Sequence, residues 1–319
     1  MLPFGYGQGT GQALNYGNIY ETDYGFVGGR SFGLTIAAFG FLSASIGGVV
    51  HLNIIKRRGR TIAKPEDGKR LNLADIQSDD EISMNGSTDK LTVQLAFILI
   101  SYALTFLVMY GLSALIPGMR ATIYGFNFLI GVLMATLLKF IIRFLRKKNI
   151  VIKLYVNNFL MDRISGFFFD IMVVAGIAAI QLDILEGSWT VILILGVVGL
   201  VVTYIYNYII AKTLFKEYRD EQFLAMYGML TGTASTGVIL LRELDPEYRT
   251  PAADNLVYQQ FPAIVFGFPL MLLATLAPKE PLLTLGILVA FFIVMNVILF
   301  RSKIFKRKRK ASDPEIAEE

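Results

Sequence analysis

The sequence has no cysteine and only one histidine, His51, among its 319 residues. The absence of cysteine excludes disulfides, thiolate metal ligands and a thiol nucleophile, although it carries no information about the cellular compartment. One histidine without any cysteine cannot be assembled into a zinc site or a catalytic triad. His51 lies near the end of an apolar run, where we expect an interfacial residue rather than a catalytic one.

The sequence also lacks a recognisable nucleotide-binding loop. Gly5, Gly7, Gly9 and Gly11 recur at every second position. A phosphate-binding loop, however, needs a preceding strand and, in its commonest form, a following Lys-Ser/Thr pair, and the sequence predicts neither. We therefore expect that the protein is not an enzyme.

Charged residues are scarce. They make up 17% of the chain, whereas 54% of the chain is hydrophobic and the mean hydropathy is +0.55. An apolar helix of about 20 residues crosses roughly 30 Å of hydrocarbon, and a soluble core does not need several runs of that length. The sequence therefore predicts an all-α, polytopic membrane protein. The expected spans are residues 32–55, 91–116, 121–144, 159–182, 189–214, 257–277 and 281–300.

The net charge of +5 is carried by Lys and Arg residues that flank these runs. A basic balance can indicate a nucleic-acid partner, but basic flanks of apolar runs are typical of the cytoplasmic side of a membrane. We expect a lipid bilayer and no nucleic acid. If residues 56–90 form a cytoplasmic loop, the Lys and Arg residues fall on the inner side except for Arg30, Arg120 and Lys279. The predicted location is the cell membrane, with a cytoplasmic tail at residues 305–319.

This topology requires that two Gly/Thr-rich stretches, residues 3–17 and 227–238, do not cross the membrane. Non-helical backbone at membrane depth is tolerated only where it is buried in protein or lines a wet cavity. We therefore expect two re-entrant hairpins that open from opposite sides, the second at about residues 222–245. Such an inverted repeat is a recurring plan of secondary transporters.

The motifs in these stretches resemble those of a known family. Residues 227–237 read YGMLTGTASTG, with Asp245-Pro246 downstream, and residues 7–13 read GQGTGQA. They are similar to the C-terminal and N-terminal hairpins of the sodium/glutamate symporter family, whose first hairpin usually contains a Gly-Gly-x-Gly-Thr-Ala run. Gln8 and Gly11 depart from that run, so the solute stays open between glutamate and another dicarboxylate or anionic solute.

The resemblance implies sodium-coupled uptake of glutamate by alternating access, with Na⁺ as the coupling ion and no other cofactor. A homodimer is among the assemblies that it allows. Family members usually have further spans before the first hairpin, so residues 1–55 are expected to be the remnant of an N-terminal repeat. Residues 91–304 would form the C-terminal repeat with six spans. The alternative is a truncated, non-transporting fragment or a partner in a membrane complex.

The candidate binding residues follow from the same motifs. Backbone N–H groups and hydroxyls can bind a carboxylate, oxygen atoms can bind Na⁺, and glycine permits close backbone approach. The alternative is that small residues only let helices pack closely. The expected substrate and ion residues are Thr231, Gly232, Thr233, Ser235, Thr236, Gly237, Gly7, Gly9, Thr10 and Asp170.

Asp170 lies well inside the apolar run at residues 159–182. An ionised carboxylate at that depth is costly unless it is paired, hydrated or protonated. Asp170 could bind Na⁺, as could Thr233, or it could carry a proton; a hydrogen bond between helices made by the neutral acid is the structural alternative.

Overall fold

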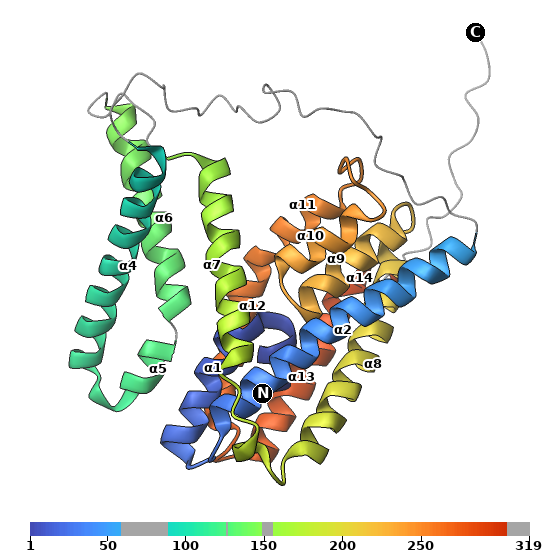
Figure 1. Ribbon diagram of the computed structural model, residues 1–319, viewed down its shortest axis with the longest axis horizontal. Helices are drawn as coiled ribbons and strands as arrows, with labels where there is room; N and C mark the ends of the chain where they lie inside the picture. The colour runs from blue at the N-terminus through green and yellow to red at the C-terminus, as the bar shows by residue number, and fades with distance from the viewer. Residues whose placement is uncertain (59–88, 126, 149–155, 305–319) are drawn as a thin grey trace, which may run out of the picture. The chain divides into compact units, whose positions relative to one another are not determined.

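The computed structural model describes residues 1–58, 89–125, 127–148 and 156–304. Within these ranges the chain forms helices and turns and no strand, as the sequence predicts (Figure 1). The chain divides into two compact units, Met1–Val257 and Tyr258–Glu319. The predicted loop at 56–90 and the predicted tail at 305–319 lie almost entirely outside the described residues, and the predicted domain boundaries stay a prediction.

Four of the described helices are long and apolar enough to cross a membrane. They are α2 (Gly29–Arg57, of which Gly29–Ile55 is the span), α4 (Lys90–Leu115), α8 (Trp189–Leu214) and α13 (Pro281–Leu299). These four confirm four of the predicted spans and the assignment of the protein to a membrane.

The other three predicted spans are helical but are not among the four. The run at 121–144 is covered by α5 (Arg120–Gly125) and α6 (Asn127–Lys147), and the run at 257–277 by α11 (Ala252–Tyr258) and α12 (Gln260–Leu276). The run at 159–182 is covered mainly by α7 (Asn158–Ala178). Asp162, Arg163 and Asp170 make α7 more polar than the four apolar helices.

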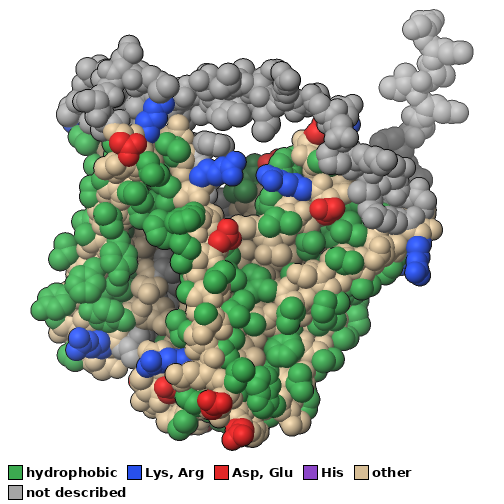
Figure 2. All heavy atoms as spheres, in the orientation of Figure 1, with side chains coloured by type: hydrophobic (Ala, Val, Ile, Leu, Met, Phe, Trp, Pro, Cys, Tyr) green, Lys and Arg blue, Asp and Glu red, His purple; other side chains and the backbone are tan. Residues whose placement is uncertain are grey.

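The spans differ in how much protein covers them. More than half of the α2 span is buried (56%), against 11% for α4 and 17% for α8. Hydrophobic side chains cover much of the outer surface of the molecule (Figure 2). On α4 and α8 the exposed side chains include Phe106, Leu107, Val197 and Val202. Such surface is costly in water but favourable in lipid, so α4 and α8 present it to the bilayer and α2 lies inside the protein.

Helix α1 (Leu2–Tyr24) and α2 form an antiparallel pair. The turn between them contains Gly25 and Gly28, whose φ values of 71° and 78° are in the left-handed region that favours glycine. The two backbones then approach closely, because a Cβ at Gly17 or Gly33 would collide with a carbonyl of the other helix. Small residues of this kind are the usual means of close helix packing in membranes.

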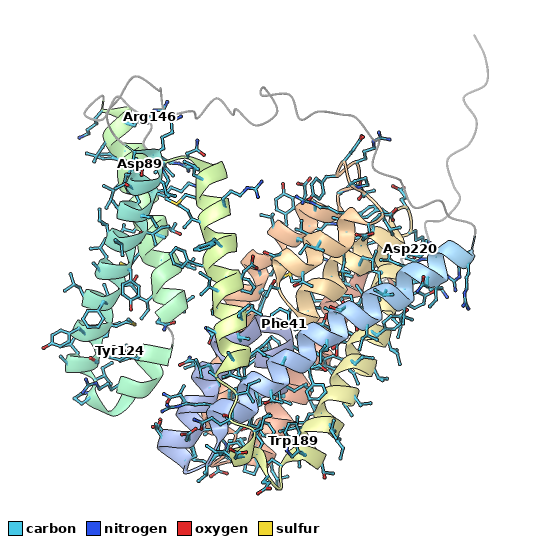
Figure 3. The ribbon with its side chains drawn as sticks, viewed as in Figure 1. Phe41, Asp89, Tyr124, Arg146, Trp189 and Asp220 are labelled. Carbon is cyan, nitrogen blue, oxygen red and sulfur yellow. The ribbon has the colours of Figure 1, made fainter. Side chains whose placement is uncertain are left out.

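The remaining helices of the first unit pack around this pair. Helix α9 (Arg219–Thr231) lies alongside α10 (Ala234–Arg242) and against α2, and α7 packs against α1 (Figure 1). Helices α4 and α6 pack against each other, with Asp89 and Arg146 at one end of this pair and Tyr124 beyond the other end (Figure 3). The Gly-rich stretches of the sequence therefore lie in α1 and in α9 and α10, which contact each other through α1 and α9.

Candidate functional site: two helix breaks in contact

Helix α1 is broken at Gly9. This residue has φ 76° and ψ −168°, a combination that is essentially restricted to glycine. Gly9 therefore ends one short helix, and Thr10 begins the next. Breaking a helix exposes carbonyl groups at the end of the first half and N–H groups at the start of the second half. Gly9 and Thr10 are both buried, so these groups lie inside the protein.

A second break separates α9 from α10 at Gly232 and Thr233. Gly232 has φ −140° and ψ −99°, and Thr233 is extended with φ −149° and ψ 173°. Thr233 caps α10, because its Oγ1 accepts a hydrogen bond of 3.3 Å from the N–H of Thr236. Neither residue has positive φ, so Gly232 is required for close approach and not for left-handed backbone.

The two breaks lie in contact. A Cβ at Gly9 would lie 3.5 Å from Cγ2 of Thr233 and 3.9 Å from the carbonyl oxygen of Gly232. Residues more than two hundred positions apart in the sequence thus meet at the two places where a helix is interrupted. The structure brings together Gly9, Thr10, Thr231, Gly232 and Thr233 of the predicted site.

Helix α2 lies against both breaks through Gly40. A Cβ at Gly40 would lie 2.6 Å from the carbonyl oxygen of Thr231 and 3.3 Å from that of Gly5. Gly33, Gly40 and Gly47 are spaced by seven residues and so share one face of α2. This glycine face was not among the predicted site residues, although the seven-residue spacing could have indicated it.

Thr10 is the most unusual polar residue at the breaks. It is 1% exposed, and its Oγ1 has no hydrogen-bond partner among the described residues. On the side that faces α7, a Cβ added at Gly176 would lie 3.1 Å from the existing Cβ of Thr10. A buried hydroxyl without a partner costs about 1–3 kcal/mol, which a bound group could recover.

The second break carries a different set of donors. The N–H of Gly237 donates a hydrogen bond of 3.0 Å to the Thr233 carbonyl oxygen, and Thr233 Oγ1 accepts one from the N–H of Thr236. The remaining first-turn N–H groups of α10 belong to Ala234 and Ser235, and both residues are exposed. The start of α10 therefore presents donors and the positive end of a helix dipole, which favour an anion.

Several predicted residues have structural partners or lie elsewhere. The Thr231 hydroxyl donates to the Tyr227 carbonyl oxygen at 2.6 Å, and a Cβ at Gly237 would collide with the Ala225 carbonyl oxygen. These two residues therefore serve helix packing at least in part, which is the alternative considered from the sequence. A Cβ at Gly7 would meet no atom within 4 Å.

Asp170 is not at the breaks. Its side chain is exposed on α7. Helix α7 faces α1 through Met172 and Gly176, which lie next to Gly11 and Thr10. At about 100° per residue, Asp170 is turned roughly 160° from Met172 around the helix. The role of Asp170 in ion binding stays a prediction.

A network of tyrosine hydroxyls holds the neighbouring helices together. The Tyr6 hydroxyl donates to the Gly196 carbonyl oxygen at 2.6 Å and lies 3.0 Å from Ser43 Oγ. The Tyr227 hydroxyl donates to the Ser43 carbonyl oxygen at 2.8 Å. These bonds link α1 to α8 and α9 to α2, so both broken helices are fixed to spanning helices close to their breaks.

Asp245 closes the loop that follows α10. Its carboxylate accepts bonds of 2.8 Å from the N–H groups of Arg249 and Thr250, and 2.7 Å from the Thr250 hydroxyl. Burial alone raises the pKa of this carboxyl, but the hydrogen bonds and the Arg249 charge outweigh it, and the pKa is lowered from its ordinary value. The ionised carboxylate thus holds the segment between α10 and α11 in place.

The polar groups at the breaks are hydroxyl, carbonyl and N–H groups. No group of three or more His, Asp or Glu side chains that could hold a metal occurs in the part of the chain that the structure describes. The Thr10 hydroxyl and the carbonyl oxygens at the ends of the broken helices are neutral oxygen donors, which unwound helices use to bind Na⁺ in transporters.

No family model, curated protein or solved structure matches the chain.

Proposed function

We propose that the chain is a sodium-coupled secondary transporter that takes up glutamate or a similar small anion. The observation that carries this proposal is the contact between the break at Gly9 and the break at Gly232 and Thr233. Broken helices that meet inside a membrane protein are a general design for binding solute and coupling ions. The choice of glutamate and sodium rests on the resemblance of the two glycine-rich motifs to the sodium/glutamate symporters.

The chemistry of the two breaks supports this assignment. The start of α10 offers N–H groups and a positive dipole end to a carboxylate. The buried Thr10 hydroxyl and the carbonyl ends of the broken helices offer oxygen atoms to a cation. An anion and a cation can therefore be bound side by side, which lowers the cost of moving either charge into a low-dielectric site.

The proposal includes the predicted inverted repeat. The broken helix α1 is followed by the span α2, and the pair α9 and α10 is followed by α11 and α12. In the proposed arrangement, the first break belongs to a re-entrant hairpin that opens outward and the second to one that opens toward the cytoplasm. Movement of the breaks, together with α2 and α8 to which they are bonded, relative to α4 would then expose the solute to each side in turn.

Uptake by purified protein tests the proposal. The protein is reconstituted in vesicles, and entry of labelled glutamate is measured with an inward sodium gradient, with a potassium gradient, and with no gradient. We expect entry only with the sodium gradient, and competition by unlabelled glutamate but not by a neutral amino acid. Vesicles in which glutamate entry is independent of sodium would refute the coupling, and competition by other dicarboxylates would reassign the solute.

A variant pair connects uptake to the breaks. Gly232→Val places a branched side chain where a Cβ alone would lie 2.8 Å from Thr236 Oγ1 and 3.2 Å from the Gly228 carbonyl oxygen. We expect it to abolish uptake while the protein still inserts in the membrane. Gly111→Val is the control, because a Cβ at Gly111 on α4 meets no atom within 4 Å. Normal uptake by Gly232→Val would place the solute site elsewhere.

A further inference from the structure

The only histidine of the chain is buried between three helices. His51 lies on α2 and is 2% exposed. Its Nδ1 is 3.0 Å from the Tyr204 hydroxyl on α8, and its ring lies 3.9 Å from the Phe223 ring on α9. The sequence predicts an interfacial residue near the end of a span. The structure places His51 near the end of α2 but inside the protein. The charged form of a side chain is costly there unless it is paired, so a buried histidine suggests a function.

The other ring nitrogen faces a carboxylate. His51 Nε2 is 3.7 Å from Oδ1 of Asp220, a residue in the first turn of α9 whose side chain is 5% exposed. This distance is within reach of an ion pair but is too long for a hydrogen bond, and Nε2 has no hydrogen-bond partner among the described residues. Asp220 lies where α9 begins, beside the last turns of α2 (Figure 3).

We propose that His51 and Asp220 form a proton-binding site. A neutral imidazole has one N–H group and can donate to only one of its two neighbours, whereas an imidazolium donates to both Tyr204 and Asp220. Histidine is also the side chain that changes charge between pH 5 and 8. The site takes up one proton on the ring and releases it again, and no covalent bond to another group is formed.

The surrounding charges act on the added proton in both directions. Arg219 bonds Asp220 through Nε at 2.9 Å and Nη2 at 3.2 Å, but it also interacts with the carboxylate of Glu221, which is buried. The carboxylate of Asp220 favours a proton on the His51 ring, and the guanidinium of Arg219 offsets part of this effect. Helix α8 adds only the neutral rings of Tyr204 and Tyr208. Arg58, in the turn that follows α2, also acts on Tyr204, and its positive charge opposes a second positive charge on His51.

The site is joined to the breaks by the contact between α2 and α9. The two helices run antiparallel, so that Asp220 faces His51, Tyr227 faces Gly47, and the Thr231 carbonyl faces Gly40. Gly40 lies about three helical turns, or roughly 16 Å, before His51. A proton that strengthens the contact at the start of α9 therefore also fixes the end of α9, where the second break begins. The effect on transport rests on the proposed function, whereas the proton site itself does not.

Nuclear magnetic resonance of the intact protein tests the proton site directly. Because His51 is the only histidine, labelling with ¹⁵N-histidine gives one pair of ring signals, whose shifts report which nitrogen carries a proton. In nanodiscs we expect the second nitrogen to gain a proton between pH 8 and 5. A ring that stays neutral down to pH 5 would overturn the proposal.

Two variants assign the partner. Asp220→Asn should weaken proton binding at His51 about tenfold or more, because the facing carboxylate is lost. Asp254→Asn removes an exposed carboxylate from the first turn of α11 and should leave the titration unchanged. If Asp220→Asn does not fold, Tyr204→Phe removes the other partner at constant shape and should also weaken proton binding. A titration that is the same in the wild type and in the folded partner variant contradicts the assignment.

The link to the breaks is tested by the pH dependence of uptake. In vesicles at equal inside and outside pH, we expect glutamate uptake to change with pH between 5.5 and 8, and this change to be lost in His51→Gln. A His51→Gln protein that keeps the wild-type pH dependence would overturn the link. If no variant or wild type takes up glutamate, the proposed function fails, and the ring titration still decides the proton site.

Discussion

At the scale of single residues, Gly9 is the position that the proposed site can least replace. Its backbone conformation is one that residues with a Cβ rarely adopt. A Cβ added at Gly9 would point toward Thr233 and Gly232. Because both features act on the same residue, a change at Gly9 affects the break in α1 and its contact with the second break together.

Gly9→Ala should therefore destabilise the protein and also reduce uptake. We expect a loss of about 1–3 kcal/mol in the free energy of unfolding, measured by denaturant titration in detergent, from backbone strain alone. Gly111→Ala is the control, because Gly111 lies inside α4 with no atom near its Cβ position. Alanine in a helix is better than glycine by about 0.5–1 kcal/mol, so this variant should be equal to or more stable than the wild type. Equal behaviour of the two variants would mean that Gly9 is not strained.

Asp245 gives a prediction outside the spans. Since its pKa is lowered in the folded protein, its contribution to stability is present above the ordinary pKa of an aspartate and is lost as the pH falls through the folded value. Asp245→Asn should lower the free energy of unfolding by about 1–2 kcal/mol at pH 7, from weakened hydrogen bonds to Thr250 and Arg249. The difference from the wild type should shrink as the pH falls below about 4. A difference that stays constant from pH 7 to pH 3 would show that ionisation of Asp245 is irrelevant to the loop.

At the scale of elements, sequence reasoning works for features that a segment determines by itself. The four long apolar helices follow from hydrophobicity and length, and the two interruptions fall inside the Gly/Thr-rich stretches, because glycine there weakens the helix locally. The contact of Gly9 with Thr233 and that of His51 with Asp220 could not be predicted, because they depend on which helices become neighbours. Asp170 illustrates the limit. The sequence shows that Asp170 lies deep in an apolar run, but it does not show whether Asp170 lies on the face of α7 that packs against α1.

The cap of α10 gives a prediction at this scale. Thr233→Ala removes a hydroxyl that accepts from the N–H of Thr236 and lies 3.2 Å from its hydroxyl. Loss of one or two hydrogen bonds is worth roughly 1–3 kcal/mol, so the apparent affinity for sodium or glutamate should fall about tenfold to a hundredfold in the uptake assay. Thr136→Ala in α6 removes a hydroxyl that bonds the Val132 carbonyl oxygen and should leave the affinity unchanged. Equal affinities in the two variants would assign Thr233 to structure alone.

At the scale of the whole molecule, the protein combines a buried span with apolar spans that face lipid. Helix α2 contacts α1, α8 and α9 and carries both the glycine face and His51, whereas α4 and α8 present apolar side chains outward. Helix α8 faces lipid and also packs against α1, α2 and α9, whereas α4 packs mainly against α5, α6 and α7, away from the helices that hold the breaks. This division is what a transporter needs if one part is to move against another.

The most direct measurement is thiol labelling of Ser235→Cys, which the cysteine-free chain makes unambiguous. Ser235 is exposed at the start of α10, and Ser188→Cys, before α8, is the control on the predicted outer side. The account predicts that a small hydrophilic reagent reaches position 235 from the cytoplasmic side, and that sodium and glutamate together protect it while position 188 stays reactive from outside. Labelling of position 235 that is unaffected by both solutes, or that occurs only from outside, would contradict the claim that the two breaks form the solute site.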